Sequence, residues 1–360
     1  LRRGSFRHQS RHSQKSRDSR LPAWQGVPVT DYSDLSEDAQ IEIMRAVAAT
    51  AAASYDLEPV PLELVTHAYN TTFAMARGTE RVAMRIGTGS TSGIDDVVAQ
   101  HAFVRHLAAA GVSVPDPLLT VTGAEGVLVP CGPMGRDVLV TAARWLEGPD
   151  LEELDAADAH QLGRTMARMH QASEAFVMPS GGQLPELVEP LFGESDTLSQ
   201  LTDLSAADAA VLTEAMARCQ AAFEQVMTGA RLIPCHADLH GNNLKRSADG
   251  SIAVFDFDDV GLTLPVLDLA ISAFYLSAGT EMENLMAGYA EIRELPIAVT
   301  EADFSALVAS RQLLLANEML TTTTASMRAE GANYLAKSVD RLRRWLETGE
   351  FSISPVNAPQ

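Results

Sequence analysis

Residues 236–243 of the chain read His-Ala-Asp-Leu-His-Gly-Asn-Asn, and residues 252–259 read Ile-Ala-Val-Phe-Asp-Phe-Asp-Asp. Three oxygen-bearing side chains stand here at a defined spacing: Asp238, Asn243, and Asp256 at the end of an apolar run. Moving a phosphoryl group from a nucleotide to a hydroxyl needs a carboxylate that orients and deprotonates the acceptor, and oxygen ligands that hold Mg²⁺ against the phosphates. The spacing therefore predicts Asp238 as the catalytic base, with Asn243 and Asp256 as magnesium ligands.

Apolar periodicity predicts the elements on either side of these residues. Strands predominate before residue 150, and helices surround one small sheet after it, so the fold class is α+β. In the first part we expect helices at 37–53 and 94–110, and strands at 62–68, 71–77, 81–86, 118–121, 126–130 and 138–146. In the second part we expect strands at 231–238, 243–246 and 251–257, and helices at 155–174, 206–228, 266–276, 301–325 and 331–347.

Composition excludes several classes of partner. The chain of 360 residues carries 27 Lys and Arg against 47 Asp and Glu, a formal net charge of -20, which repels phosphate backbones, so we expect no nucleic-acid partner. Even the apolar residues 266–276 are interrupted by Asp268, and no run approaches the roughly 18 residues of a membrane helix, so no membrane partner is expected. Three cysteines cannot form a disulfide framework in a chain of this length, which favours a reducing, cytoplasmic compartment.

The N-terminal residues 1–25 differ from the rest. Residues 1–20 hold seven basic residues, one acidic residue and a single large aromatic, Phe6. Such a segment buries too little apolar surface to become ordered, so we expect a disordered basic tail. It lacks the apolar stretch of a secretory signal. An organellar transit peptide, a fragment and a wrongly assigned start remain open as explanations.

The residues quoted above resemble motifs of the aminoglycoside phosphotransferase family. Residues 236–243 are similar to its catalytic loop, His-Gly-Asp-Leu-His-Pro-Gly-Asn, and residues 255–259 to its metal segment, Ile-Asp-Phe-Gly-Asp. Further similarity is found at residues 110–115, 144–148, 162–170 and 265–270, so the resemblance spans about residues 60–280. It implies a protein-kinase-like bilobal fold, with a strand-rich N-terminal nucleotide-binding lobe (26–143), a hinge (144–150) and a mainly helical C-terminal lobe for catalysis and acceptor binding (151–350).

The resemblance also implies an activity and further site residues. We expect a kinase that moves the γ-phosphate of ATP, or of GTP, with Mg²⁺ to a hydroxyl of a small molecule, an aminoglycoside-like or amino-alcohol acceptor being one candidate class. Arg85 occupies the place of the phosphate-holding lysine of the third strand, and Trp145 and Leu146 belong to the hinge. Asn70 and Thr71, in the turn before that strand, offer backbone N–H groups to the phosphates. The oligomeric state and the identity of the acceptor are not implied.

Several residues depart from the family pattern. Ala237 replaces a glycine, and residues 241–242 replace Pro-Gly; both are small changes that a loop tolerates. Asp258 stands where glycine is usual, which tilts the metal loop or adds a carboxylate near it. Gln100 aligns with the helix glutamate that would pair with Arg85, so an amide stands where an ion pair belongs. How Arg85 is held is therefore open.

Other functions fit parts of the pattern. A protein Ser/Thr kinase would share the fold. Asp256-Phe-Asp-Asp-Val also fits a haloacid-dehalogenase-like phosphatase with an aspartyl nucleophile, although residues 236–243 then have no role and the only downstream lysine is Lys337. A non-catalytic nucleotide-binding module would explain Gln100, but the intact Asp238 argues against it. Asp268 is expected to brace a loop or cap a helix, and His236 to be a buried scaffold.

Overall fold

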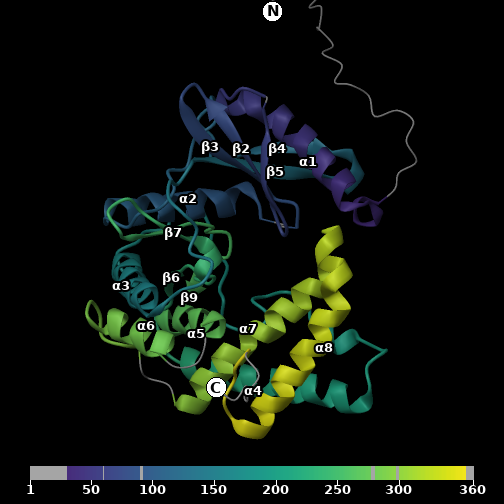
Figure 1. Cartoon of the computed structure of the whole chain (residues 1–360), viewed down its shortest axis with the longest axis vertical. Helices are drawn as coiled ribbons and strands as arrows, with labels where there is room; N and C mark the ends of the chain where they lie inside the picture. Colours follow the sequence, from purple (N-terminus) through teal and green to yellow (C-terminus); the bar gives the residue numbers. More distant parts are fainter. Residues whose placement is uncertain (1–30, 60, 90–91, 277–279, 297–299, 354–360) are drawn as a thin grey trace, which may run out of the picture.

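The computed structural model describes residues 31–59, 61–89, 92–276, 280–296 and 300–353. The predicted tail at 1–25 lies outside these residues. Figure 1 shows a sheet with one covering helix at one end of the molecule and most of the helices at the other. Within the described part of the chain, no helix has both the length and the hydropathy that crossing a membrane requires.

An antiparallel sheet of five strands forms the N-terminal lobe, with the order β1-β2-β3-β5-β4. The strands are β1 (Glu63–His67), β2 (Thr71–Arg77), β3 (Glu80–Ile86), β4 (Val127–Cys131) and β5 (Arg136–Arg144). Helix α1 (Glu37–Ala52) begins at Ser36, whose hydroxyl accepts from the Ala39 amide, and packs against β2, β3 and β4. In β3 the fully buried Val82, Met84 and Ile86 alternate with Ala83 and Arg85, which line a cavity. The period of two therefore gives this strand one core face and one binding face.

The predicted strand at 118–121 is wrong. The amides of Thr120 and Val121 donate to the carbonyls of Ala124 and Ser54 and not to a neighbouring strand, so the segment forms no continuous ladder. The Leu118 amide still donates to the carbonyl of Ala142 in β5, but a turn follows, closed by the bond from the Gly123 amide to the Thr120 carbonyl. Helix α2 (Ile94–Ala109) precedes this segment and packs its buried face against α3 (Ala156–Ser173) of the C-terminal lobe.

Helices build most of the C-terminal lobe. After α3 come α4 (Ala206–Met227), α5 (Pro265–Tyr275), α6 (Thr280–Ala290), α7 (Glu301–Thr321) and α8 (Ala325–Thr348). Helix α6 was not predicted, and within it Gly288 lowers the intrinsic helix propensity. Close packing of α6 on α3 offsets that cost: a Cβ on Gly163 would lie 2.0 Å from the carbonyl oxygen of Leu285, and one on Gly288 1.9 Å from that of His160.

The boundary between α7 and α8 also differs from the prediction. Helix α8 begins at Ala325, whereas the sequence suggested that the first helix continues to that residue and the second begins at 331. The break falls within four consecutive threonines, 321–324, whose branched side chains disfavour helix. Gly331 lies within α8, where a Cβ would approach the Met319 carbonyl oxygen to 3.1 Å.

Two small sheets, rather than one, lie beneath the N-terminal lobe. Strand β6 (Ile233–Cys235) pairs with β9 (Gly261–Thr263), which was not predicted, and β7 (Leu244–Arg246) pairs with β8 (Ile252–Val254). Both pairs are antiparallel, and the three predicted strands are shorter than expected. The loops that follow β6 and β8 carry the candidate site residues.

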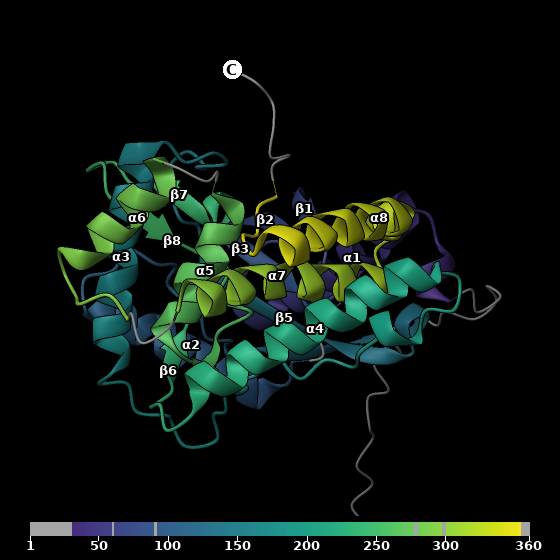
Figure 2. The ribbon, with the colours of Figure 1, turned by 90° about the horizontal axis from the view of Figure 1, so that it is seen from below.

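A second connection joins the two lobes beyond the chain segment at 144–150. Gln40 of α1 is fully buried, and its Nε2 donates to the carbonyls of Tyr32 (2.9 Å) and Thr323 (2.8 Å). Its Oε1 accepts from the Ala325 amide at 2.9 Å, and the Thr324 hydroxyl donates to the Ala68 carbonyl at 2.5 Å. Figure 2 shows α1 beside α8. The turn between α7 and α8 is therefore fixed to the N-terminal lobe.

Candidate active site

The loop at 236–243 is held by a buried carboxylate on α5. Asp268 is fully buried and accepts hydrogen bonds from the amides of His236 (3.1 Å) and Ala237 (2.6 Å). His170 of α3 holds it in turn, with Nε2 2.9 Å from Asp268 Oδ2. Asp268 therefore braces the loop, as predicted, and lets Ala237 keep a left-handed φ of 62°.

His236 is a neutral scaffold. Its Nε2 lies 3.1 Å from the carbonyl of Phe255, which only accepts, while its Nδ1 accepts from the Asp238 amide at 3.3 Å. These two partners select the tautomer with the proton on Nε2. Burial lowers the pKa of the His236 imidazole and keeps it uncharged. The ring thus fixes the loop after β6 to the end of β8.

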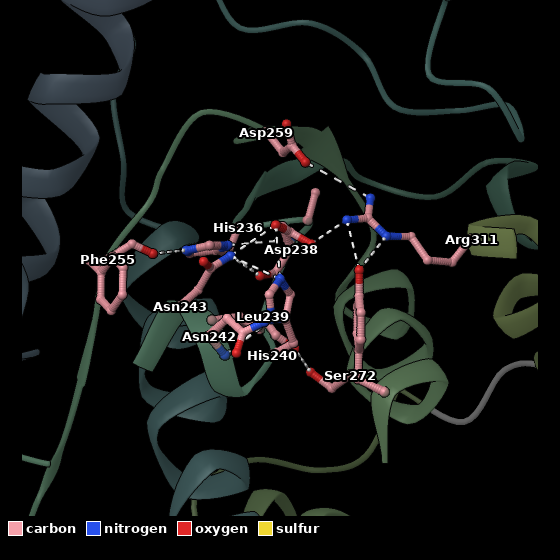
Figure 3. A network of polar contacts seen from close by, with 12 residues as sticks. His236, Asp238, Leu239, His240, Asn242, Asn243, Phe255, Asp259, Ser272 and Arg311 are labelled. Atoms are coloured by element: carbon pink, nitrogen blue, oxygen red, sulfur yellow. Dashed lines mark hydrogen bonds and ion pairs between the residues drawn. The ribbon is translucent and has the colours of Figure 1, made fainter. Parts of the chain in front are cut away.

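The Asp238 carboxylate is held at both oxygens (Figure 3). Its Oδ1 pairs with the guanidinium of Arg311, and its Oδ2 accepts from Asn243 Nδ2 at 2.8 Å and lies 3.3 Å from His240 Nε2. Burial raises the pKa of Asp238, but the Arg311 charge and the His240 hydrogen bond outweigh it and bring the pKa below its usual value. The group is therefore ionised and fixed in orientation.

Arg311 was not predicted. It lies on α7 with its side chain 4% exposed, donates to the Tyr275 hydroxyl at 3.2–3.3 Å, and approaches Asp259 Oδ2 to 3.9 Å. A buried cation requires such partners. The sequence does contain a signal for it, because Arg311 is the only charged residue between Asp303 and Glu318 in a mostly buried helix segment.

Asn243 and Asp256 are brought together by the β7–β8 hairpin. The Phe255 amide donates to the Asn243 carbonyl at 3.0 Å, so Asp256 directly follows the residue bonded to Asn243. The amide nitrogen of Asn243 is used on Asp238, which leaves its Oδ1 for a cation. Among the described residues, no hydrogen bond or ion pair engages the exposed Asp256 carboxylate. Two such oxygen donors fit Mg²⁺.

A cavity of about 490 Å³ lies between the sheet and the loop after β8, a size suited to a small ligand. Arg85, Trp145, Leu146 and Asp256 all line it. Thr71 does not: it is fully buried, and its hydroxyl bonds His67 and Thr88 at 2.8 Å, while Thr72 faces the cavity. Asn70 donates from Nδ2 to Asp258 Oδ2 at 2.8 Å.

The segment after β5 is fixed by two cations that the sequence did not single out. The guanidinium of Arg81 stacks on the Trp145 ring at 3.7 Å from its centroid. Lys245 of β7 is largely buried, and its Nζ lies 2.8 Å from Asp150 Oδ1 and 3.2 Å from the Gly148 carbonyl. Both cations also line the cavity, so they shape the wall near the predicted hinge.

Comparisons with known proteins agree with this geometry. The model of the phosphotransferase enzyme family matches residues 63–297. Amicoumacin kinase of Bacillus subtilis is 25% identical over 272 residues, which cover 69% of this chain and 77% of that protein. A microcompartment-associated aminopropanol kinase is similar in structure, with a TM-score of 0.71 and 25% identity over 86% of this chain and 99% of that chain. Amicoumacin kinase hAmiN in complex with AMP-PNP, Ca²⁺ and Ami has a TM-score of 0.68 at 20% identity, covering 89% and 98%.

Proposed function

Because the chain belongs to the phosphotransferase enzyme family, we propose that it moves the γ-phosphate of ATP, or of GTP, with Mg²⁺ to a hydroxyl of an amino-alcohol or aminoglycoside-like acceptor. The family and the kinase relatives make the chain a phosphotransferase that acts on a hydroxyl of a small molecule. The protein-kinase-like α+β fold predicted from the motifs is confirmed. The proposal adds the nucleotide, the metal and the acceptor class.

The observation that carries the proposal is that Asp256 lines the cavity across from Arg85, while hydrogen bonds from the Phe255 amide to Asn243 and from Asn243 to Asp238 join the two loops next to it. Asp238 would accept the proton of the acceptor hydroxyl, oriented by its bonds to Arg311 and Asn243. Arg85 would bind phosphate oxygens. Asn243 and Asp256 would hold Mg²⁺, which when bound neutralises charge on the phosphates. A structural relative at 20% identity that carries AMP-PNP and Ca²⁺ supports a nucleoside triphosphate and a divalent cation.

Charge around the base supports an acceptor that carries an amine. Arg311 is surrounded by the carboxyl groups of Asp238, Asp259 and Glu318. Burial raises the pKa of Asp259 and favours its neutral form, so it would ionise more readily beside a bound cation. Burial raises the pKa of Glu318 to about 7, and an ammonium group nearby would favour its ionised form. The names of the relatives, an aminopropanol kinase and an amicoumacin kinase, point to the same class.

A direct assay tests the proposal. Purified protein is incubated with ATP or GTP and Mg²⁺, together with an amino alcohol, a hydroxylated amino acid or an aminoglycoside, and release of ADP or GDP is followed. Phosphorylated product is identified by mass spectrometry, and Asp238→Asn is the blank. Release above this blank with an amine-bearing alcohol supports the proposal, whereas release only with uncharged alcohols contradicts the acceptor class. A phosphatase with Asp256 as nucleophile would release phosphate from a monoester instead, a reading that the family match over residues 63–297 disfavours.

The cysteines support a cytoplasmic location, which we include in the proposal. Cys131, Cys219 and Cys235 are all buried and unpaired. Burial raises the pKa of each thiol, which keeps them unreactive.

A further inference from the structure

Arg85 has no anionic partner among the described residues of its own lobe. It lies on β3 between Thr72 of β2 and Thr141 of β5, and its side chain is 24% exposed. A cation in such a position is fixed only by a nearby carboxylate or by its ligand. Gln100 of α2 lines the same cavity, but an amide carries no charge. The Gln100 Nε2 instead donates to the backbone carbonyl of Asp258 at 3.1 Å.

The missing carboxylate comes from the loop after β8. Arg85 forms an ion pair with Asp258 Oδ2, and Asn70 Nδ2 donates to the same oxygen at 2.8 Å. The Asp258 side chain is 23% exposed, and the residue stands two positions after Asp256. One carboxylate thus joins the β1–β2 turn, strand β3 and the loop of the candidate metal ligand.

We propose that Asp258 is the positioning residue of Arg85, doing from the C-terminal lobe what a helix carboxylate at position 100 would do from the N-terminal lobe. The inference rests on the proposed function, because it assigns Arg85 to the phosphates. The planar guanidinium can donate to Asp258 with one arm and to phosphate oxygens with the others. The family pattern has glutamate at position 100 and glycine at position 258, whereas this chain has Gln100 and Asp258. The two departures together then move one carboxylate from position 100 to position 258.

The position of Asp258 has a structural consequence. Arg85 and Asn70 belong to the N-terminal lobe, whereas Asp258 follows β8. The cation is therefore oriented only while the sheet and the loop after β8 are in contact. A carboxylate on α2 would belong to the same lobe as Arg85, so it would orient the guanidinium whether or not the loop after β8 were in contact with the sheet.

A double-mutant cycle on stability tests the pairing without any nucleotide. Arg85→Gln, Asp258→Asn and the double variant are compared with wild type by thermal unfolding. We expect each single variant to unfold at a lower temperature and the double variant to lose clearly less than the sum. The matched control is Arg81 with Glu63, an exposed pair at 3.1 Å on the same sheet, whose cycle should be additive. Additive losses at Arg85 and Asp258 would overturn the proposal.

Nucleotide affinity tests the function of the pair. Binding of ATP is measured by calorimetry in EDTA and in Mg²⁺ for wild type, Asp258→Asn, Gln100→Glu and Asp258→Asn/Gln100→Glu. We expect Asp258→Asn to bind ATP about tenfold more weakly in both conditions, and the double variant to regain most of this loss. The double variant has the wild-type net charge, so its recovery reports where the carboxylate stands.

Three results would overturn the inference. Weaker binding of Asp258→Asn only in Mg²⁺ would make Asp258 a metal ligand, and tighter binding in EDTA would make it a competitor of the phosphates. Failure of Gln100→Glu to restore binding would show that position 258 cannot be replaced. Wild-type protein that binds neither ATP nor GTP would refute the proposed function instead, while the unfolding cycle would still decide whether Asp258 anchors Arg85.

Discussion

Arg311 of α7 forms an ion pair with Oδ1 of Asp238, at a position that the phosphotransferase family model, which ends at residue 297, does not reach. The loop at 236–243 is therefore completed by a helix outside the matched segment. Because Asn243 and His240 contact the other carboxylate oxygen, Arg311 fixes the orientation of the Asp238 carboxylate together with them.

Asp238→Asn should reduce turnover by about 10²–10⁴-fold while leaving nucleotide affinity within a few-fold of wild type. The amide cannot accept the hydroxyl proton, but it preserves the shape of the site. Steady-state assays of nucleotide-dependent product formation and calorimetry with ATP give the two values. Turnover near the wild-type level would remove Asp238 from the role of base, and circular dichroism checks that the variant is folded.

Arg311→Met should lower kcat by about a hundredfold with little change in the KM for nucleotide, because it frees one oxygen of the base without touching the cavity. Arg311→Lys should recover part of kcat. The control is Arg218→Met, which removes an exposed arginine in a pair with Glu214. Equal kcat in Arg311→Met and wild type would show that the ion pair does not orient Asp238.

Asn243→Ala and Asp256→Ala should each weaken nucleotide binding in Mg²⁺ roughly tenfold or more, with a much smaller effect in EDTA. Each variant removes one oxygen ligand of a hard cation. Calorimetry with a non-hydrolysable nucleotide in both conditions measures the difference. An unchanged ratio of the two affinities in both variants would place the metal elsewhere.

Glu318→Gln should change how stability depends on pH. Burial raises the pKa of Glu318 from its ordinary 4.5 to about 7, so the folded chain keeps a proton that the unfolded chain loses. Wild-type stability therefore falls as pH rises from about 5 to 8, by at most about 3 kcal/mol from this group. Urea unfolding at both pH values should show a smaller loss in Glu318→Gln. Identical losses in variant and wild type would contradict the shifted pKa, and Glu214→Gln, at an exposed position, is the control.

Gly163→Ala should destabilise the protein by about 3 kcal/mol, because its Cβ would lie 2.0 Å from the Leu285 carbonyl oxygen of the neighbouring helix. Gly331→Ala is the matched control in another helix. There the nearest atom is 3.1 Å away, and the gain in helix propensity offsets the crowding. Urea unfolding compares the two, and a smaller loss at Gly163 than at Gly331 would refute the close contact of α3 and α6.

Most of the candidate site could be predicted because its residues lie close together in the sequence. Asp238, Asn243 and Asp256 lie within nineteen consecutive residues, so a loop and one hairpin are enough to bring them together. Arg311 lies 73 residues from Asp238, and local periodicity carries no information on such a contact. The contact between Arg85 and Asp258 could not be predicted either, although the sequence showed each of them separately as a departure from the family pattern.

The errors in the fold have a similar origin. Helix α6 consists mostly of good helix formers, but it contains Gly288, and the close contact with Gly163 of α3 that makes a glycine suitable there is not visible in the local sequence. Residues 118–121 were expected to form a strand, but the amides of Thr120 and Val121 donate to Ala124 and Ser54, contacts that the local sequence does not reveal. The strand at 81–86 was predicted correctly, because one face of β3 packs in the core and the other lines the cavity, which produces a clear alternation in the sequence.

Gln40 gives the molecule an unusual mechanical property. The two lobes are attached by the chain at 144–150, by the packing of α2 on α3, and by the bonds from Gln40 to the turn at Thr323 and Ala325. Three separate attachments leave the two lobes little freedom to rotate about one another. Wide separation of the lobes would therefore require the buried amide of Gln40 to lose its partners.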